Sequence, residues 1–392
     1  MPIAGRTRPT RRDFIAGTAA AAAGMGFPAV LRAQSPLELR FRTIPDPDGW
    51  HPSLRLKGDW LIFEVSDGVV SGYGEASHSR DDAGCRDAAR AIFDRHYRSF
   101  RPSLASLAAK EAEIAALEPE FVEATAYSGL NQALYDLLAK REQVPVWQLF
   151  ADQRRIDGIP LYTTINRALE TRTLSEYMER VGQLAAQGFK IFKCAPFEAV
   201  DGPDNAIAKS RAGLDMLASL RKAFPGLGMR VDFHERFVPA DFFELLPALE
   251  ALDLDWIEEP FTMGPAFAEM IARTPLRVAA GELFWGWDRF ARIVDNGWAH
   301  VIMPDVKHVG GFGPLLGVLE KGTGRIEISP HNPSGPVSTA ASLHAAALYP
   351  DTVRSLEFSF DRSGTRRSTG ERIEDGVLYL SDRPGWGVEP PA

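Results

Sequence analysis

The chain has 392 residues, of which 45% are hydrophobic and 24% are charged, an ordinary composition for a globular protein of two or three domains. Its formal net charge is −8. Setting aside the five Arg and one Asp of residues 1–33 leaves 39 basic and 51 acidic residues, a net charge of −12. This acidic surplus argues against nucleic acid or an anionic membrane as a partner.

Residues 1–33 are predicted to be an export signal. Arg11 and Arg12 precede an Ala- and Gly-rich stretch that ends near Ala33, where cleavage is expected. The arrangement resembles a twin-arginine signal, a route that carries folded proteins. The stretch is interrupted by Pro28 and is too rich in Ala and Gly for a membrane span. We therefore expect a periplasmic protein whose mature form has no membrane segment.

Residues 34–155 are predicted to form an α+β domain. An alternating run at 37–42 indicates a strand, and a Ser-Asp-Gly turn joins two further apolar runs as a hairpin. Three segments with helical periodicity follow. They cover residues 81–100, 103–117 and 124–141. In the last segment, four leucines fall on one face of the predicted helix.

From Ile159 to about residue 358, short apolar strands alternate with amphipathic helical segments. Eight such units predict a (β/α)₈-type barrel whose last unit is shortened or replaced. We therefore assign residues 156–358 to a barrel domain, and residues 359–392 to a segment that packs back on the first domain. The strands are expected near residues 160–165, 189–195, 229–234, 254–258, 277–281, 300–304, 326–330 and 353–357.

Three acidic residues each close a short apolar run at the pitch of consecutive β/α units. They are Asp232, Glu258 and Glu282, which are 26 and 24 positions apart. In a parallel barrel the carboxyl ends of neighbouring strands gather at one rim, where active sites lie. Three carboxylates around one point repel one another unless a cation sits among them, and all-oxygen ligation favours Mg²⁺. The alternative is a set of surface strand ends that acidic residues cap.

With these residues the chain resembles the enolase superfamily, in its mandelate racemase branch, from about Leu37 to Glu389. Residues 71–76 resemble the family's hairpin end, residues 133–140 resemble its last capping helix, and the three acidic residues match its Mg²⁺ ligands. Three segments most resemble galactonate dehydratase-like members: Asp232-Phe-His234, Asp305-Val-Lys-His308-Val-Gly-Gly311 and Pro330-His331-Asn-Pro-Ser-Gly335-Pro336.

The resemblance implies removal of a proton next to a carboxylate, which forms an ene-diolate that a divalent cation stabilises. His331 is implied as the general base, oriented by Asp305. His234 is implied as the acid that protonates the leaving hydroxyl. Lys193 is implied as the residue that holds the substrate carboxylate. Glu357 either hydrogen-bonds that carboxylate when protonated or is only a strand-end acid.

Each of these assignments has a structural alternative. His331 could be a loop residue, His234 a hydrogen-bonded histidine at the barrel end, and Lys193 a lysine whose amine reaches solvent along a buried stem. His308 is interpreted either as a substrate contact or as a structural residue. Glu259 is expected to turn away from the metal.

One position departs from the family pattern, because Ala195 replaces the second lysine of the family's Lys-x-Lys pair. Racemases of the branch use that lysine as one of two opposed bases. We therefore expect a Mg²⁺-dependent lyase that dehydrates an acid sugar, either an aldonate or an aldarate. The alternatives are an epimerase or racemase that uses His331 and His234 on opposite faces, and a non-catalytic exported protein that binds a sugar acid.

The expected partner is a small-molecule carboxylate substrate, and the sequence is compatible with a homo-oligomer. Cys85 and Cys194 could pair in an oxidising periplasm. We expect two buried free thiols instead, because Cys85 falls in the first domain and Cys194 in a barrel strand between inward-facing neighbours.

Overall fold

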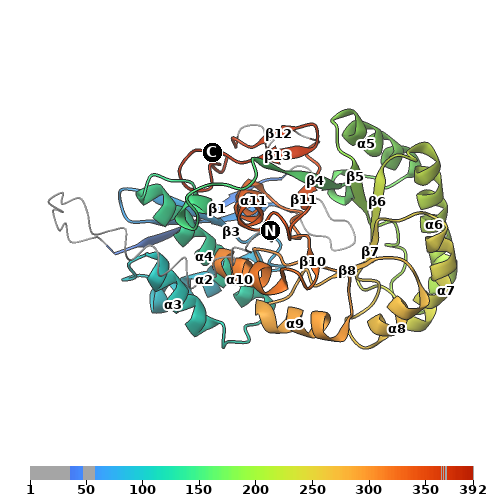
Figure 1. Ribbon diagram of the computed structural model, residues 1–392, viewed down its shortest axis with the longest axis horizontal. Helices are drawn as coiled ribbons and strands as arrows, with labels where there is room; N and C mark the ends of the chain where they lie inside the picture. The colour runs from blue at the N-terminus through green and yellow to red at the C-terminus, as the bar shows by residue number, and fades with distance from the viewer. Residues whose placement is uncertain (1–35, 47–57, 363, 365, 367–368, 392) are drawn as a thin grey trace, which may run out of the picture.

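The computed structural model describes residues 36–46, 58–362, 364, 366 and 369–391 (Figure 1). The predicted export signal lies outside these described residues. No helix among them is long and apolar enough to cross a membrane.

The N-terminal part is a three-stranded antiparallel sheet packed on helices, as the sequence predicts. Its strands are β1 (Glu38–Ile44), β2 (Trp60–Ser66) and β3 (Ser71–Glu75), and its helices are α2 (Asp82–His96), α3 (Leu104–Ile114) and α4 (Phe121–Arg141). Strand β3 lies so close to α4 that a side chain at Gly72 or Gly74 would overlap the backbone of that helix. These two glycines therefore set the distance between sheet and helix.

The second part is built on eight parallel strands, all at the positions predicted from the sequence. They are β4 (Gly158–Thr164), β5 (Ile191–Cys194), β6 (Gly228–Asp232), β7 (Trp256–Glu258), β8 (Val278–Ala280), β9 (Val301–Ile302), β10 (Glu327–Ile328) and β11 (Leu356–Ser359). Pairing runs from β4 to β10 in chain order, β11 pairs with β4, and a bridge between Ile328 and Val353 links the β10 strand to the segment before β11. The (β/α)₈-type fold with an N-terminal capping domain is thereby confirmed.

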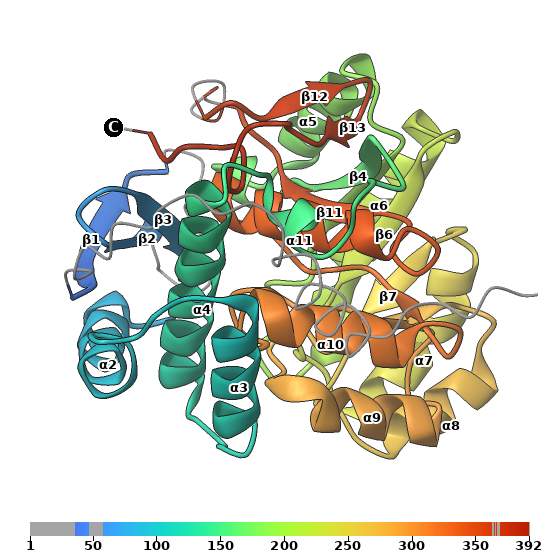
Figure 2. The ribbon, with the colours of Figure 1, turned by 60° about the vertical axis from the view of Figure 1, so that its left-hand side comes forward.

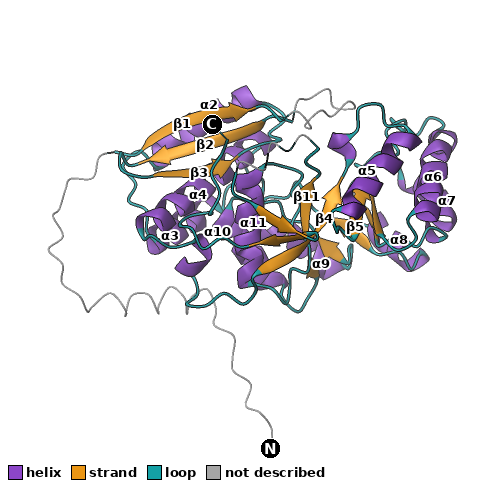
Figure 3. Cartoon of the chain, turned by 90° about the horizontal axis from the view of Figure 1, so that it is seen from above, coloured by secondary structure: helices purple, strands orange, loops and turns teal. Residues whose placement is uncertain are grey.

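Helices surround the strands, and two short 3₁₀ helices follow the capping domain and β4. They are η1 (Val146–Leu149), η2 (Asn166–Ala168), α5 (Leu174–Ala186), α6 (Ala206–Ala223), α7 (Pro239–Glu250), α8 (Ala266–Arg273), α9 (Gly286–Asn296), α10 (Phe312–Gly322) and α11 (Pro336–Leu348). Figure 3 shows the three-stranded sheet beside the barrel strands, with helices between them.

Helix α4 joins the two parts and is buried on every side from residue 124 to residue 139. The sheet and α2 cover one side, while α10 and η1 cover another (Figure 2). The leucine face predicted from the sequence is only part of its buried surface. Polar residues occupy the rest and are hydrogen-bonded: Ser128 Oγ accepts from the N–H of Gly310, and Asp136 accepts from the N–H of Tyr73.

The last barrel unit is modified, because a hairpin rather than a helix follows β11 in the described residues. The hairpin consists of β12 (Arg372–Glu374) and β13 (Val377–Tyr379), and β13 pairs antiparallel with Gly158–Pro160 of β4. These first residues of β4 extend beyond its pairing with β5 and leave an edge for β13. The tail contacts the capping domain at more than one place: Arg366 lies over the ring of Trp60, and the Trp386 indole N–H donates to the carbonyl of Tyr73.

One large hydrophobic cluster runs from the capping domain to the helices around the barrel. A smaller cluster of Tyr162, Trp256, Ala279, Val301 and Met303 comes from the barrel strands. Cys85 and Cys194 are both buried and free, which confirms the expectation from the sequence.

Candidate active site

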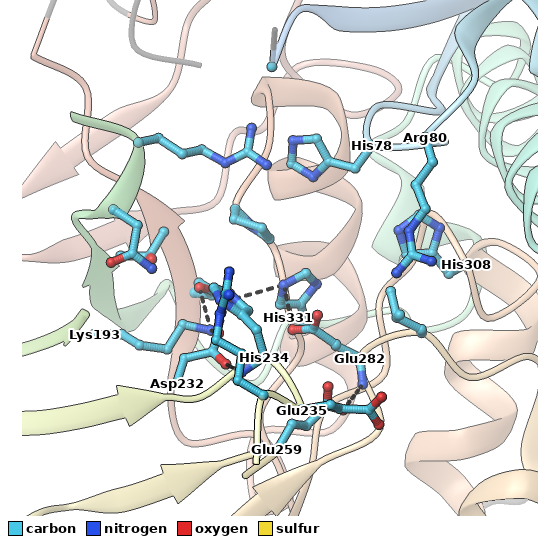
Figure 4. A pocket seen from close by; sticks show the side chains of 18 of the residues that line it. His78, Arg80, Lys193, Asp232, His234, Glu235, Glu259, Glu282, His308 and His331 are labelled. Atoms are coloured by element: carbon cyan, nitrogen blue, oxygen red, sulfur yellow. Dashed lines mark hydrogen bonds and ion pairs between the residues drawn. The ribbon is translucent and has the colours of Figure 1, made fainter. Parts of the chain in front are cut away.

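The carboxyl ends of the barrel strands border a cavity of about 990 Å³ that the capping domain also lines. Six of the eight predicted site residues line it: Lys193, Asp232, His234, Glu282, His331 and Glu357. Glu258 and Asp305 are fully buried beneath this layer. Figure 4 shows Lys193 and Asp232 on one side of the cavity and His331 and Glu282 on the other.

The three predicted metal ligands converge. Asp232 ends β6, its register partner Glu258 ends β7, and Glu282 follows β8. One carboxylate oxygen from each lies within 4.8 Å of the other two. Oxygens bound to one Mg²⁺ are roughly 3–4 Å apart, so this carboxylate set fits a small oxygen-ligated divalent cation. Gly281 makes the turn to Glu282 with a φ of 101°, and a side chain there would meet Phe290.

Glu259 points away from this cluster, as expected. Its carboxylate accepts from the N–H groups of Gly281 and Glu282 at 2.8 and 3.3 Å. Burial, with the neighbouring Glu282 charge, raises the pKa of Glu259 to about 8. Glu259 therefore fixes the loop that presents Glu282.

Lys193 lies among carboxylates rather than at the surface. Its Nζ is 2.5 Å from Glu258, 3.0 Å from Glu357 and 3.5 Å from Asp232. Burial opposes the charge, but these carboxylates raise the pKa of Lys193 well above its ordinary value. The residue is only 1% exposed, which argues against a lysine whose amine reaches solvent.

His331 follows β10 and is held by two carboxylates. Its Nδ1 is 2.7 Å from Asp305, and its Nε2 is 3.0 Å from Glu282. Burial lowers the pKa of His331, but the charges of Glu282 and Glu357 and the bond to Asp305 raise it well above the ordinary value. The carboxylate of Asp305 therefore orients one ring nitrogen while the other faces the cavity.

Lys307 is a member of this group that the sequence reasoning missed. Its Nζ donates to both oxygens of Asp305 at 2.8 and 2.7 Å, and its side chain is fully buried. Burial acts to raise the pKa of Asp305, but Lys307 and the nearby histidines lower it below the usual range. The spacing of two residues in Asp305-Val-Lys307 was the available signal.

His234 follows β6, several strands before the strand that precedes His331. Its φ is 50°, its N–H donates to Asp232, and its Nε2 lies 3.1 Å from the same carboxylate. The side chain is 27% exposed, so it reaches the cavity. The two imidazoles thus come from positions separated by strands β7, β8 and β9.

His308 joins the cavity wall to the capping domain. Its Nδ1 is 2.9 Å from Thr125 Oγ1, and its ring centroid is 4.6 Å from that of Phe121. Burial lowers the pKa of His308 to about 3, which keeps the ring neutral. These contacts tie His308 to the capping domain, and the residue also lines the cavity.

Glu75, at the end of β3, is a second residue that sequence reasoning missed. Its carboxylate accepts from the N–H groups of Gly335 and Ser338 at 2.7 and 3.0 Å, at the N-terminus of α11. A negative charge at a helix N-terminus is stabilising. The capping domain therefore holds the helix that begins just after His331.

Further cavity residues were not predicted, among them His78, Arg80 and Arg167. His78 and Arg80 lie between β3 and α2, each with a φ of 66°, a conformation that non-glycine residues seldom adopt. Arg167 follows β4, which is the position that the strand-end rule indicates, and that rule could have found it.

Two family models match the chain and define its class. One, described as Enolase C-terminal domain-like, matches residues 176–392. The other, the Mandelate racemase / muconate lactonizing enzyme N-terminal domain, matches residues 58–151. The chain therefore belongs to the enolase superfamily of enzymes, in its mandelate racemase branch.

Particular relatives refine this assignment. A D-galactonate dehydratase of Variovorax paradoxus (strain S110) is 28% identical over 283 residues, which are 68% of this chain and 71% of the relative. A mandelate racemase/muconate lactonizing enzyme from Jannaschia sp. CCS1 has 24% identity and a TM-score of 0.78, with 91% of this chain and 95% of that chain covered. The 3,6-anhydro-D-galactonate cycloisomerase from Zobellia galactanivorans has 19% identity and a TM-score of 0.75, with 91% and 97% covered. The two solved structures share the fold.

Proposed function

We propose that the protein is a Mg²⁺-dependent hydro-lyase that removes the α-proton of an acid sugar and eliminates water. The observation that carries the proposal is the position of His331, whose Nε2 lies 3.0 Å from Glu282 of the carboxylate cluster while Asp305 holds its Nδ1. A general base and a metal-ligand set thus meet at one point of the cavity. The likeness to a D-galactonate dehydratase supports the same reaction class.

Each side chain then has a step in the reaction. A divalent cation held by Asp232, Glu258 and Glu282 would stabilise the negative charge that develops on the substrate carboxylate. In its neutral form, with Nδ1–H donated to Asp305, His331 takes the α-proton at Nε2, and Asp305 stabilises the imidazolium that forms. His234 gives a proton to the departing β-hydroxyl, which leaves as water.

Lys193 places a positive charge at the reacting carboxylate, and Ala195 leaves the neighbouring position without a base. A racemase needs a base on each face of the α-carbon, so this position favours elimination with one base. The following experiment distinguishes dehydration from epimerisation by His331 and His234.

The experiment follows α-proton exchange and elimination in D₂O by NMR, with a panel of aldonates and aldarates. We expect His331→Asn to lose both reactions by roughly 10²–10⁴-fold, because no α-proton is removed. His234→Asn should lose elimination but keep exchange, because the base and the metal ligands remain. Mg²⁺ binding and circular dichroism of both variants control for folding.

Normal elimination by His234→Asn, or exchange retained only in His331→Asn, would contradict these roles. An epimerase would instead lose exchange from one epimer in each variant. A binding protein would show no exchange with any acid of the panel.

We also propose that residues 1–33 export the folded protein to the periplasm. Replacing both Arg11 and Arg12 by Lys should retain the protein in the cytoplasm. Fractionation of cells measures this, and unchanged periplasmic protein after the substitution would contradict it.

A further inference from the structure

The cavity has a second polar region, away from the carboxylate cluster. In Figure 4, His78 lies at the opposite end of the view from Glu259 and Asp232. The metal-ligand end of the cavity consists mainly of carboxylates, and it would contact only one end of a substrate. The chemistry of the other end therefore decides what the rest of the substrate carries.

Arg167 provides a positive charge to this region. It is half-buried in η2, at the end of β4, and lines the cavity. Within the described residues, its guanidinium makes no hydrogen bond or close ion pair. Burial lowers the pKa of Arg167 to about 10, with Asp46 and Glu357 acting in the opposite direction. Arg167 is therefore charged at neutral pH and has hydrogen-bond donors to spare.

His78 adds a hydrogen-bond donor to the same cavity. Its Nδ1 is 3.2 Å from Ser334 Oγ, whereas its Nε2 is buried and has no hydrogen-bond partner among the described residues. When the Ser334 hydroxyl donates to Nδ1, Nε2 carries the proton. Burial, followed by the charge of Arg167, lowers the pKa of His78 well below the ordinary value, so the ring is neutral. Buried polar groups without partners are rare and call for an explanation.

Three other charged residues of the cavity have hydrogen-bond partners in the chain, although Arg236 Nε has none among the described residues. Asp81 accepts from the N–H of Gly84, and Asp82 accepts from Ser79 Oγ. Arg236 donates to the carbonyl of Val200 at 2.9 Å. The donors of Arg167 and His78 are thus not taken up by these carboxylates.

Resting on the proposed function, we propose that Arg167 and His78 form a second carboxylate subsite and that the substrate is a hydroxy dicarboxylic acid. A guanidinium binds a carboxylate through two parallel hydrogen bonds, and a neighbouring neutral N–H adds a third. An aldarate has a carboxylate at each end of its chain. An aldonate would instead place a neutral hydroxymethyl group against Arg167 and add no negative charge to those of Asp46 and Glu357.

Isothermal titration calorimetry with Mg²⁺ present tests this without turnover. The probes are 2-hydroxy dicarboxylates of four to six carbons and 2-hydroxy monocarboxylates of the same lengths. We expect the wild-type protein to bind the diacid of at least one length about 10–100-fold more tightly than its matched monoacid, as is typical of hydrogen bonds to charged groups. Arg167→Gln should remove that preference, and Arg167→Lys should keep part of it.

Arg80→Gln is the matched control, because it removes one positive charge from the same cavity. Arg80 is exposed and lies over the Phe121 ring at 4.9 Å, so the diacid preference should persist in this variant. Circular dichroism and Mg²⁺ titration show whether each variant is folded.

Equal affinity for diacids and monoacids at every length would overturn the proposal. Loss of the preference in Arg80→Gln as complete as in Arg167→Gln would also overturn it, because a diffuse positive potential would then suffice. If the proposed dehydration is wrong but the carboxylate subsite is right, the outcome differs from both of these results. Diacids would then bind through Arg167, yet none would exchange its α-proton in D₂O.

Discussion

The two halves of the barrel rim balance their charges in different ways. The acidic half, on β6 to β8, gathers Asp232, Glu258 and Glu282 within 4.8 Å, with Lys193 as the cation beside them. The histidine half follows β9 and β10, where Lys307 donates to both oxygens of Asp305, and Asp305 holds His331.

Because of this difference, we expect the stability of the acidic half to depend on a bound metal and that of the histidine half not to. In the acidic half, burial and the neighbouring carboxylates raise the pKa of Glu258 well above its ordinary value despite the charge of Lys193, so the full set of charges calls for a further cation. In the histidine half, the barrel itself supplies the counter-charges, and Glu75 of the capping domain accepts hydrogen bonds at the start of α11. Variants of the two halves should therefore respond differently to Mg²⁺.

The largest effect is expected from Lys307→Met. Removing one member of a buried charged group leaves Asp305 with its histidine partners and the backbone N–H of residue 307, which typically costs about 3–5 kcal/mol. The loss should be the same with and without Mg²⁺. Urea unfolding under both conditions measures it. A loss that Mg²⁺ restores would show that the two halves are not independent.

Acid should destabilise the histidine half next. His344 of α11 is buried, accepts from the N–H of Trp147 through Nδ1, and has its Nε2 3.2 Å from the carbonyl of Trp386. Burial lowers its pKa from 6.5 to about 4, so at acid pH the unfolded chain binds a proton that the folded chain does not. The contribution of His344 to the free energy of unfolding is therefore complete above pH 6.5 and is lost as the pH falls toward 4.

The expected loss from this group is roughly 3 kcal/mol. Unfolding free energies measured between pH 4 and 7 test it, with His344→Gln as the control. An equally steep pH dependence in that variant would assign the acid sensitivity to other groups.

Glu258→Gln should remove the stabilisation by Mg²⁺ and leave the metal-free fold intact. At a Mg²⁺ concentration 100 times the Kd, the wild-type protein gains about 2.7 kcal/mol from binding. Glu259→Gln is the matched control, because this carboxylate faces the backbone of Gly281 and its pKa is about 8. Thermal unfolding with and without Mg²⁺ compares the two variants, and equal Mg²⁺ shifts in both would contradict the ligand assignment.

The smallest effect is expected from Glu75→Gln, which replaces one of two acceptor oxygens at the N-terminus of α11 with a donor. We expect a loss of about 1–2 kcal/mol in stability together with a lower kcat, because the helix that follows His331 shifts. Glu64→Gln, in the same sheet, should affect stability slightly and kcat not at all, because Glu64 pairs with the half-exposed Arg42. Equal kcat in both variants would contradict a positioning role for Glu75.

The sequence alone determined the order of the elements and the residues that meet at the rim. Strand and helix periods are local properties, so all eight barrel strands and the capping helices could be placed. Parallel strands end at one rim, so the spacing of Asp232, Glu258 and Glu282 implied their convergence before any coordinates. Lys193, His331 and Asp305 followed from motifs at the same strand ends.

Tertiary structure decided what the local pattern does not encode. Glu75 caps a helix whose first residues lie about 260 positions away, and β13 pairs with the exposed edge of β4 rather than with the capping sheet. Arg167 and His78 come from different domains and share one cavity only after those domains pack. Hydrogen bonds and charge balance depend on distances in space, and those distances are set when the two parts of the chain close over the rim.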